Sequence, residues 1–245
     1  MKVIMRNSSL VFVRNNSFKR TYNSSFCNGR YFNTSATPSV GSVFDKACQD
    51  GATRSAFVIP VYNGDKIEAN GFITSSTDKY IVVTDRNFVV KSIVEQSADE
   101  KIINISEDGF VIASALISSN PIINVTSKVN IDCEFYANYV LNTFINSTGT
   151  QKSTNGASII RSIPVKANDK VYALTKGLNG NVTALGFSGT EPTESTKYDI
   201  VSKPNTSNVV ASNTVITNNG YVGISSADIR NFAVVITEMK ANSVS

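Results

Sequence analysis

The chain has 245 residues, a formal net charge of +4 and only 17% charged residues, and it contains neither histidine nor tryptophan. Without histidine, the chain alone cannot form a serine–histidine or cysteine–histidine nucleophile pair, and it lacks the commonest general base and metal ligand. Serine, threonine and asparagine supply most of the polar character, which favours β-surfaces and turns over helices. We therefore expect an all-β protein that is not an enzyme and has no cofactor.

Positive charge is concentrated near the N-terminus. Residues 1–44 contain six basic residues and no acidic residue. Within them, Leu10–Val13 predicts a short strand, and the Asn- and Ser-rich stretch 15–25 predicts a loop or arm. We interpret residues 1–27 as a basic anchor segment that contacts an acidic partner surface through Lys2, Arg6, Arg14, Lys19 and Arg20. The alternative is that these residues only solubilise an exposed segment. Nucleic acid is a weaker candidate because Lys and Arg are not densely clustered.

Seven short runs rich in Val, Ile, Phe and Thr follow, separated by polar turn residues, which is typical of a sandwich or barrel. The predicted strands are Ser55–Val61, Lys66–Thr74, Tyr80–Thr84, Phe88–Val94, Ile102–Ile105, Phe110–Leu116 and Ile122–Val125. The dipeptides Asn63-Gly64 and Asp108-Gly109 predict hairpin turns of type I′, which need positive φ at both central positions.

The sequence contains an internal repeat. Ile59–Ile67 (IPVYNGDKI) aligns with Ile163–Val171 (IPVKANDKV), and further along the chain Ile105–Val111 aligns with Ile216–Val222. Lys79–Val82 has a third, shorter echo in Lys197–Val201, so that the spacing between copies changes from segment to segment. Length differences of this kind are absorbed by loops. The repeat therefore predicts one β-unit present twice.

Two tandem β-sandwich domains follow from this repeat, at residues 28–137 and 138–245. Between the two copies, residues 131–145 mix aromatic and aliphatic side chains. This stretch predicts a pair of strands, with a short amphipathic helix as the alternative. Heptad repeats are absent from the sequence, which excludes a coiled-coil stalk within the chain.

The repeated Ile-Pro-Val box is the most specific local pattern. Proline cannot donate a ladder hydrogen bond, so we expect Pro60 and Pro164 at a strand edge or start. The following Gly-Asp or Asn-Asp pair predicts a tight turn, and a structural role explains the whole box. The alternative is a ligand site on exposed acids, with these candidate residues: Tyr62, Asp65, Tyr172 and Asp169. No metal is predicted, because the regularly spaced oxygen ligands of a calcium loop are missing.

The three cysteines, Cys27, Cys48 and Cys133, form no pair with zinc-ligand spacing. We predict reduced structural thiols, with a Cys27–Cys48 bridge as the alternative. The N-terminus begins like a signal peptide, but Arg6 and Arg14 interrupt the apolar run. No stretch approaches the roughly 18 apolar residues of a membrane span. We expect synthesis in a cytoplasm and no membrane association.

The stretch Lys2–Val13 (KVIMRNSSLVFV) resembles the short N-terminal strand of many structural proteins from phages of Bacteroides-type gut bacteria, including crAss-like phages. The segments Gly51–Asp65 and Gly156–Asp169 resemble the start of the β-sandwich modules that follow such strands. In that group the modules are similar to galactose-binding-like jelly rolls and form head fibres, tail fibres or adhesive virion decorations. Asn168 departs from the glycine of this pattern, which puts a shared ligand site in doubt more than the fold.

The resemblance implies a virion appendage protein that is made in the host cytoplasm, anchored to the capsid or tail through its N-terminus and assembled as a homo-oligomer, with a trimer favoured. The first alternative is an adhesin that binds a host surface polysaccharide. A second is a structural protein that contacts only protein neighbours. The last is a hydrolase with an acid pair that no motif marks.

Overall fold

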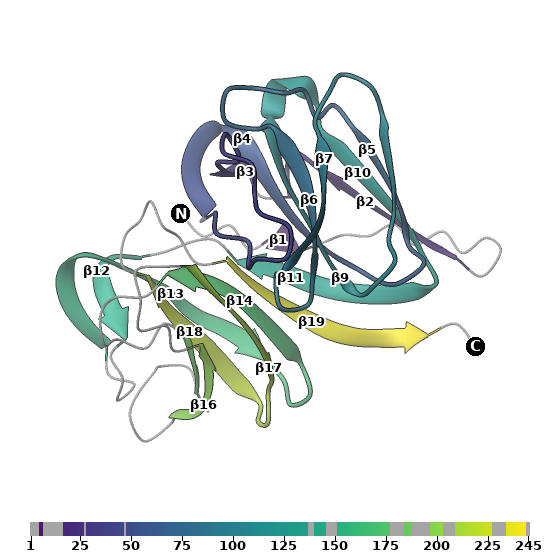
Figure 1. Ribbon diagram of the computed structural model, residues 1–245. Helices are drawn as coiled ribbons and strands as arrows, with labels where there is room; N and C mark the ends of the chain where they lie inside the picture. Colours follow the sequence, from purple (N-terminus) through teal and green to yellow (C-terminus); the bar gives the residue numbers. More distant parts are fainter. Residues whose placement is uncertain are drawn as a thin grey trace. The chain divides into compact units, whose positions relative to one another are not determined.

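The computed structural model describes residues 5–6, 17–26, 28–46, 48–136, 140–145, 151–176, 184–187, 197–202, 209–226 and 234–243. Side-chain environments are described for residues 17–26, 28–46, 48–128, 164–172 and 213–222. The described chain is all-β, with several antiparallel sheets, an arrangement consistent with β-sandwiches (Figure 1). It divides into two compact units, whose main segments are Met5–Lys46 with Asp50–Cys133 and, separately, Glu134–Met239. We call these the N-terminal and C-terminal units.

Two sheets build the N-terminal unit. One has the order β2-β10-β5-β8, and the other has the order β3-β4-β9-β6-β7. The strands of the first sheet are β2 (Phe18–Asn23), β5 (Lys66–Asn70), β8 (Lys101–Asn104) and β10 (Ile122–Ser127). Those of the second are β3 (Asn28–Phe32), β4 (Cys48–Val61), β6 (Tyr80–Asp85), β7 (Val90–Glu95) and β9 (Gly109–Leu116).

The other two sheets have the orders β1-β11-β19-β14-β17 and β12-β13-β18-β15-β16. The strands of the first are β1 (Met5–Arg6), β11 (Val129–Tyr136), β14 (Lys170–Lys176), β17 (Val209–Val215) and β19 (Val234–Ser243). Those of the second are β12 (Val140–Ile145), β13 (Gln151–Val165), β15 (Ala184–Phe187), β16 (Lys197–Ser202) and β18 (Gly220–Ser226). The described parts of the region 131–145, residues 131–136 and 140–145, therefore form strands, as the sequence predicts.

The same strand order occurs in both units. β4-β9-β6-β7 corresponds to β13-β18-β15-β16, and β10-β5-β8 corresponds to β19-β14-β17. The registers match as well, because Val61 pairs with Gly109 as Val165 pairs with Gly220. One of the predicted alignments between the two copies is wrong when the strands are matched in this way. Lys79–Val82 belongs mostly to β6, whose positional equivalent is β15, whereas Lys197–Val201 lies in β16.

All seven strands predicted for the first copy are present, although the structure moves their ends by a few residues. The predicted arm is different, because Phe18–Asn23 forms β2 and pairs with β10 throughout its length. Its alternating burial places Phe18, Arg20 and Tyr22 inside and the residues between them outside. The predicted anchor segment 1–27 therefore includes a strand of the N-terminal unit. The predicted strand Leu10–Val13 lies outside the described residues.

Aromatic side chains fill the interior of the N-terminal unit. Phe57, at the centre of β4, is fully buried and lies between Phe26 and Phe72, with ring centroids 6.2 and 5.2 Å away. Such ring pairs add about 0.5–1.5 kcal/mol each to the free energy gained by burial. A second pair, Phe88 and Phe110, stacks at 4.7 Å near the ends of β6 and β9. This packing fixes the backbone where the candidate site lies.

Candidate functional site

The most specific sequence pattern lies where the chain passes from one sheet to the other. Tyr62–Asp65 connects β4 to β5, and the connection Ile105–Asp108 returns from β8 to β9. We call these two segments together the crossover turn. Five hydrogen bonds hold it: Asp65 N to Tyr62 O (2.9 Å), Tyr62 N to Asp65 Oδ2 (3.0 Å), Gly64 N to Ile105 O (2.8 Å), Ile105 N to Asp65 O (2.9 Å) and Asn63 N to Asp108 Oδ1 (2.9 Å).

The C-terminal unit repeats the crossover turn bond for bond. Lys166–Asp169 connects β13 to β14, and Ile216–Asn219 connects β17 to β18. The five hydrogen bonds are Asp169 N to Lys166 O (3.0 Å), Lys166 N to Asp169 Oδ2 (2.7 Å), Asn168 N to Ile216 O (2.9 Å), Ile216 N to Asp169 O (2.8 Å) and Ala167 N to Asn219 Oδ1 (2.9 Å). An aspartate therefore has the same structural task in both units.

The residue before each aspartate has a left-handed backbone, with φ of +89° at Gly64 and +75° at Asn168. Glycine adopts this conformation freely, and asparagine is the side chain that tolerates it best among the rest. The departure of Asn168 from the glycine pattern is thus compatible with an unchanged turn. Asn63 is not among the residues with positive φ, so the turn is not type I′.

Both predicted hairpins are sheet crossovers, because β4 and β5, like β8 and β9, belong to different sheets. Gly109 has ordinary φ, and its role is close packing. A Cβ atom placed there would lie 1.7 Å from the backbone oxygen of Thr84 on β6. The prolines also differ from expectation. Pro60 and Pro164 each lie one residue before the end of a strand, paired with Phe110 and Tyr221.

Asp65 is 2% exposed and lies among charged groups in the N-terminal unit. Its Oδ2 atom is 3.5 Å from Nη2 of Arg20, which is 1% exposed and also donates to the hydroxyl of Tyr22 at 3.3 Å. Within the described part of the chain, Nε of Arg20 has no hydrogen-bond partner. A buried charge pair of this geometry gains less from attraction than it loses in hydration.

Burial raises the pKa of Asp65 from 3.8 to about 6. The hydrogen bond from Ser127 and the positive charge of Arg20 oppose this shift, and so does Arg86 more weakly. Asp108 adds to it by repulsion. The loss of hydration is therefore the dominant effect, and the carboxyl group is easier to protonate in the folded chain than in the unfolded one.

An arginine ties the crossover turn to the neighbouring β6–β7 loop. The guanidinium of Arg86 lies 4.6 Å from the ring centroid of Tyr62 and 5.0 Å from that of Phe110. It also donates to Val61 O at 3.3 Å. Stacking of this kind contributes about 0.5–2 kcal/mol per pair. Tyr62 is only partly exposed, and its ring already has a cationic partner within the chain.

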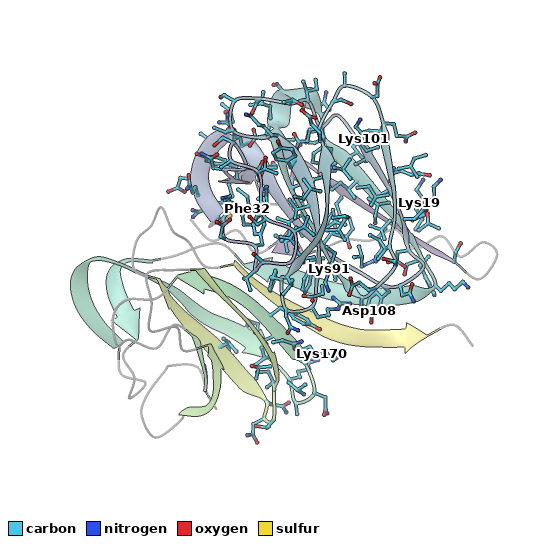
Figure 2. All side chains as sticks on the ribbon, in the orientation of Figure 1. Lys19, Phe32, Lys91, Lys101, Asp108 and Lys170 are labelled. Carbon is cyan, nitrogen blue, oxygen red and sulfur yellow. The ribbon has the colours of Figure 1, made fainter. Side chains whose placement is uncertain are left out.

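Charged residues surround this end of the N-terminal unit. Lys91 Nζ lies 3.2 Å from a carboxylate oxygen of Asp85 and 3.5 Å from one of Glu107. Lys91 and Asp108 lie at this same end (Figure 2). These pairs are largely exposed and contribute little to stability. Through Lys91 they join the β6–β7 region to Glu107, which lies in the β8–β9 connection.

The four predicted ligand residues do not form one exposed site. Asp65, Asp169 and Tyr172 are 2%, 8% and 1% exposed, so the expectation of exposed acids is wrong. Tyr62 alone of the four is partly exposed. The two aspartates instead accept hydrogen bonds from the backbone of their own turns. The structure thus agrees with the structural interpretation of the box.

The predicted anchoring residues separate as well. Lys19 is exposed on β2, whereas the buried guanidinium of Arg20 faces Asp65 and is not accessible to a partner surface. Arg20 is therefore corrected from an anchoring to an interior residue. Arg6 lies in β1, and Lys2 and Arg14 lie outside the described residues. For those three residues and Lys19, the anchoring role stays a prediction.

Sequence reasoning missed Arg20 and Arg86 as partners of the crossover turn. Residues 18, 20 and 22 alternate with polar residues, which is a pattern typical of a strand. The pattern was missed because its central inward residue, Arg20, is charged rather than apolar. No local signal marked Arg86. Asp108 and Asn219 did lie at equivalent places in the aligned repeat, which was the available sign of their common task.

Cys48 is fully buried on β4, and the state of the Cys27–Cys48 pair stays a prediction because Cys27 lies outside the described residues. Across the described ranges, no group of three or more Cys, Asp or Glu side chains is arranged to hold a metal ion. In those same ranges no helix has the length and apolar character needed to cross a membrane.

No protein-family model matches the chain, and no curated protein matches it.

Proposed function

We propose that the chain is a non-enzymatic structural protein of a phage virion, built from two tandem β-sandwich modules of jelly-roll type and attached to the particle by its basic N-terminal residues. On this proposal the modules form part of a head fibre, tail fibre or capsid decoration. The partners are other virion proteins and further copies of the same chain, with a trimer favoured.

One observation supports this proposal above the others. Three of the four residues that a ligand-binding interpretation would use, Tyr62, Asp65 and Asp169, belong to the crossover turn, which recurs with the same five hydrogen bonds in both units. A duplicated module whose most specific polar residues close its own loops is suited to a mechanical or scaffolding role. The resemblance of the N-terminal stretch to phage structural proteins supplies the particular setting.

The alternative, an adhesin for host polysaccharide, loses its named contacts. Asp65, Asp169 and Tyr172 are buried, and the ring of Tyr62 is stacked against Arg86. Sugar binding would have to use other side chains, and no specific observation points to them. We therefore retain the structural role as the proposed function.

The proposal is tested by incorporation into particles. Deleting residues 1–16 removes Lys2, Arg6 and Arg14 but keeps β2, whose loss would damage the N-terminal unit. The deletion also removes the two-residue edge strand β1, so we expect this variant to fold with a similar circular dichroism spectrum and to be absent from purified virions. The charge reversals Lys2→Glu, Arg6→Glu and Arg14→Glu together should have the same effect.

The matched control reverses three lysines elsewhere, Lys101, Lys128 and Lys170, which changes the net charge equally. Lys101 and Lys170 lie on different units (Figure 2). The control should be incorporated normally. Normal incorporation of the truncated chain would refute the anchoring role, and absence of the full-length chain from purified particles would refute the virion proposal itself.

A further inference from the structure

The strand β2 is held in the N-terminal unit through one neighbouring strand. In the described part of its sheet it lies at the edge and pairs only with β10 (Figure 1). It belongs to the sequence before the first copy of the repeat. An edge strand joined to one neighbour is the strand that a sheet exchanges most readily.

The inward side chains of β2 determine which strand sequences can pair with the edge of β10 that β2 occupies. Phe18, Arg20 and Tyr22 are 7%, 1% and 2% exposed. Tyr22 packs edge-on against Phe26 with ring centroids 5.2 Å apart, and Arg20 faces Asp65. A strand that fills this edge must therefore present an aromatic, a cation and an aromatic at alternate positions.

The buried charged contact in this attachment is weak. The Arg20–Asp65 contact of 3.5 Å is long for a charge-assisted hydrogen bond, which is usually about 2.7–2.9 Å. The bond from Arg20 to Tyr22 is 3.3 Å, and Nε of Arg20 has no partner in the described chain. Docking of β2 thus buries a charge that is incompletely compensated, which favours its release.

We propose that β2 is an exchangeable strand, and that the β10 edge vacated in one copy accepts β2 from a second copy of this chain. A second copy is the fitting partner because every copy carries the Phe-Arg-Tyr triad that the edge requires. The exchange links copies without any new surface, because each interaction within one chain becomes the same interaction between two. This inference does not depend on the virion proposal.

Thr21 and Asn124 provide a direct test. They lie opposite one another on the outer face of β2 and β10, and the Thr21 hydroxyl donates to Asn124 Oδ1 at 2.8 Å. Cysteines at directly opposed positions are close to disulfide geometry, at a Cβ separation of about 4.5–5.5 Å before adjustment. One preparation carries Thr21→Cys and the other carries Asn124→Cys. Neither chain can form this disulfide alone.

Mixed under native, mildly oxidising conditions, the two preparations should accumulate a disulfide that joins Thr21→Cys to Asn124→Cys, identified by peptide mass spectrometry. Each preparation alone controls for disulfides with the native cysteines. The double variant Thr21→Cys/Asn124→Cys should close within one chain when oxidised at low concentration, which shows that β2 still docks. If the double variant closes and the mixture yields no such linked peptide, the proposal is wrong.

The buried Arg20–Asp65 pair should set the rate at which β2 exchanges between copies. Arg20→Met removes the buried charge that Asp65 compensates incompletely and should slow formation of the linked peptide about tenfold or more. Arg20→Met/Asp65→Asn removes both charges and should slow it relative to the unaltered pair. Asp169→Asn makes the same acid-to-amide change in the other unit and should leave the rate unchanged. Equal rates in all four backgrounds would exclude the pair as the control of exchange.

Discussion

At the scale of single residues, Asp65 combines two tasks. As an acceptor for the backbone of its own turn it must lie close to the chain, and as the partner of Arg20 it must lie inside the unit. Both tasks remove it from water, and this burial raises its pKa to about 6. The same residue is therefore structurally necessary and sensitive to pH.

The sign of the pH dependence follows from the direction of the shift. The folded chain retains the Asp65 proton up to a pKa of about 6, whereas the unfolded chain releases it near 3.8. Stability from this proton is present below pH 4 and is lost as the pH rises through about 6. The free energy of unfolding of the native chain minus that of Asp65→Asn should fall by about 2 kcal/mol between pH 4 and pH 7, since one pKa unit corresponds to about 1.4 kcal/mol and the unfolded chain has already begun to release the proton at pH 4. Urea unfolding at the two pH values measures it, and a difference that grows with pH would contradict the cause we assign.

The backbone conformation at Gly64 gives a second prediction. Its φ of +89° matches the +75° of Asn168, and an added Cβ would meet nothing within 4 Å. Gly64→Asn should therefore cost less than about 1 kcal/mol of stability, whereas Gly64→Val should cost at least about 1–2 kcal/mol because a branched side chain disfavours this region. Thermal unfolding of the two variants separates these outcomes. Equal destabilisation by both would show that the left-handed turn is not required.

At the scale of elements, the crossover turn decides how the two sheets of each unit are joined. Its first segment, Tyr62–Asp65, fixes where β4 leaves one sheet and β5 enters the other. Its second segment, Ile105–Asp108, does the same for β8 and β9. The side chain of Asp108 connects the two loops by capping Asn63 N. The returning loop is thereby held at the same place as the outgoing one.

Close packing of β9 against β6 is a separate requirement at this scale. Gly109 pairs with Asp85, and any side chain there would overlap Thr84 O. Gly109→Ala should destabilise the N-terminal unit by about 3 kcal/mol or more, through overpacking against a backbone atom. Gly41→Ala is the comparison: its added Cβ meets nothing within 4 Å, so it should cost only the strain of a φ of +85°, about 1–2 kcal/mol. If chemical denaturation gave the two variants equal stability, close packing at Gly109 would not be the reason for the glycine.

The strands were predictable from sequence, but their sheets were not. Alternating and β-branched runs located all seven strands of the first copy, because each run is a local pattern. Whether Asn63-Gly64 closes a hairpin or a crossover depends on which strands pair across long sequence separations. The burial of Asp65 was hidden for the same reason, because its partner Arg20 lies 45 residues earlier in a stretch that resembled an arm.

At the scale of the whole molecule, the repeat is the feature that relates sequence to fold. Two units with one strand order and one crossover turn account for the aligned segments and for the differences between them. The differences fall where the turn permits them, as at Gly64 and Asn168. A repeated strand order is also compatible with the structural role that we propose, because repeated β-modules can extend a particle.

The central claim is that the crossover turn is closed by the same hydrogen bonds in both units. Amide hydrogen exchange of the intact chain, followed by NMR, measures this directly. We expect slow exchange at all ten donor amides: Tyr62, Asn63, Gly64, Asp65, Ile105, Lys166, Ala167, Asn168, Asp169 and Ile216. Fast exchange in either set of five, with the adjoining strands still protected, would contradict it.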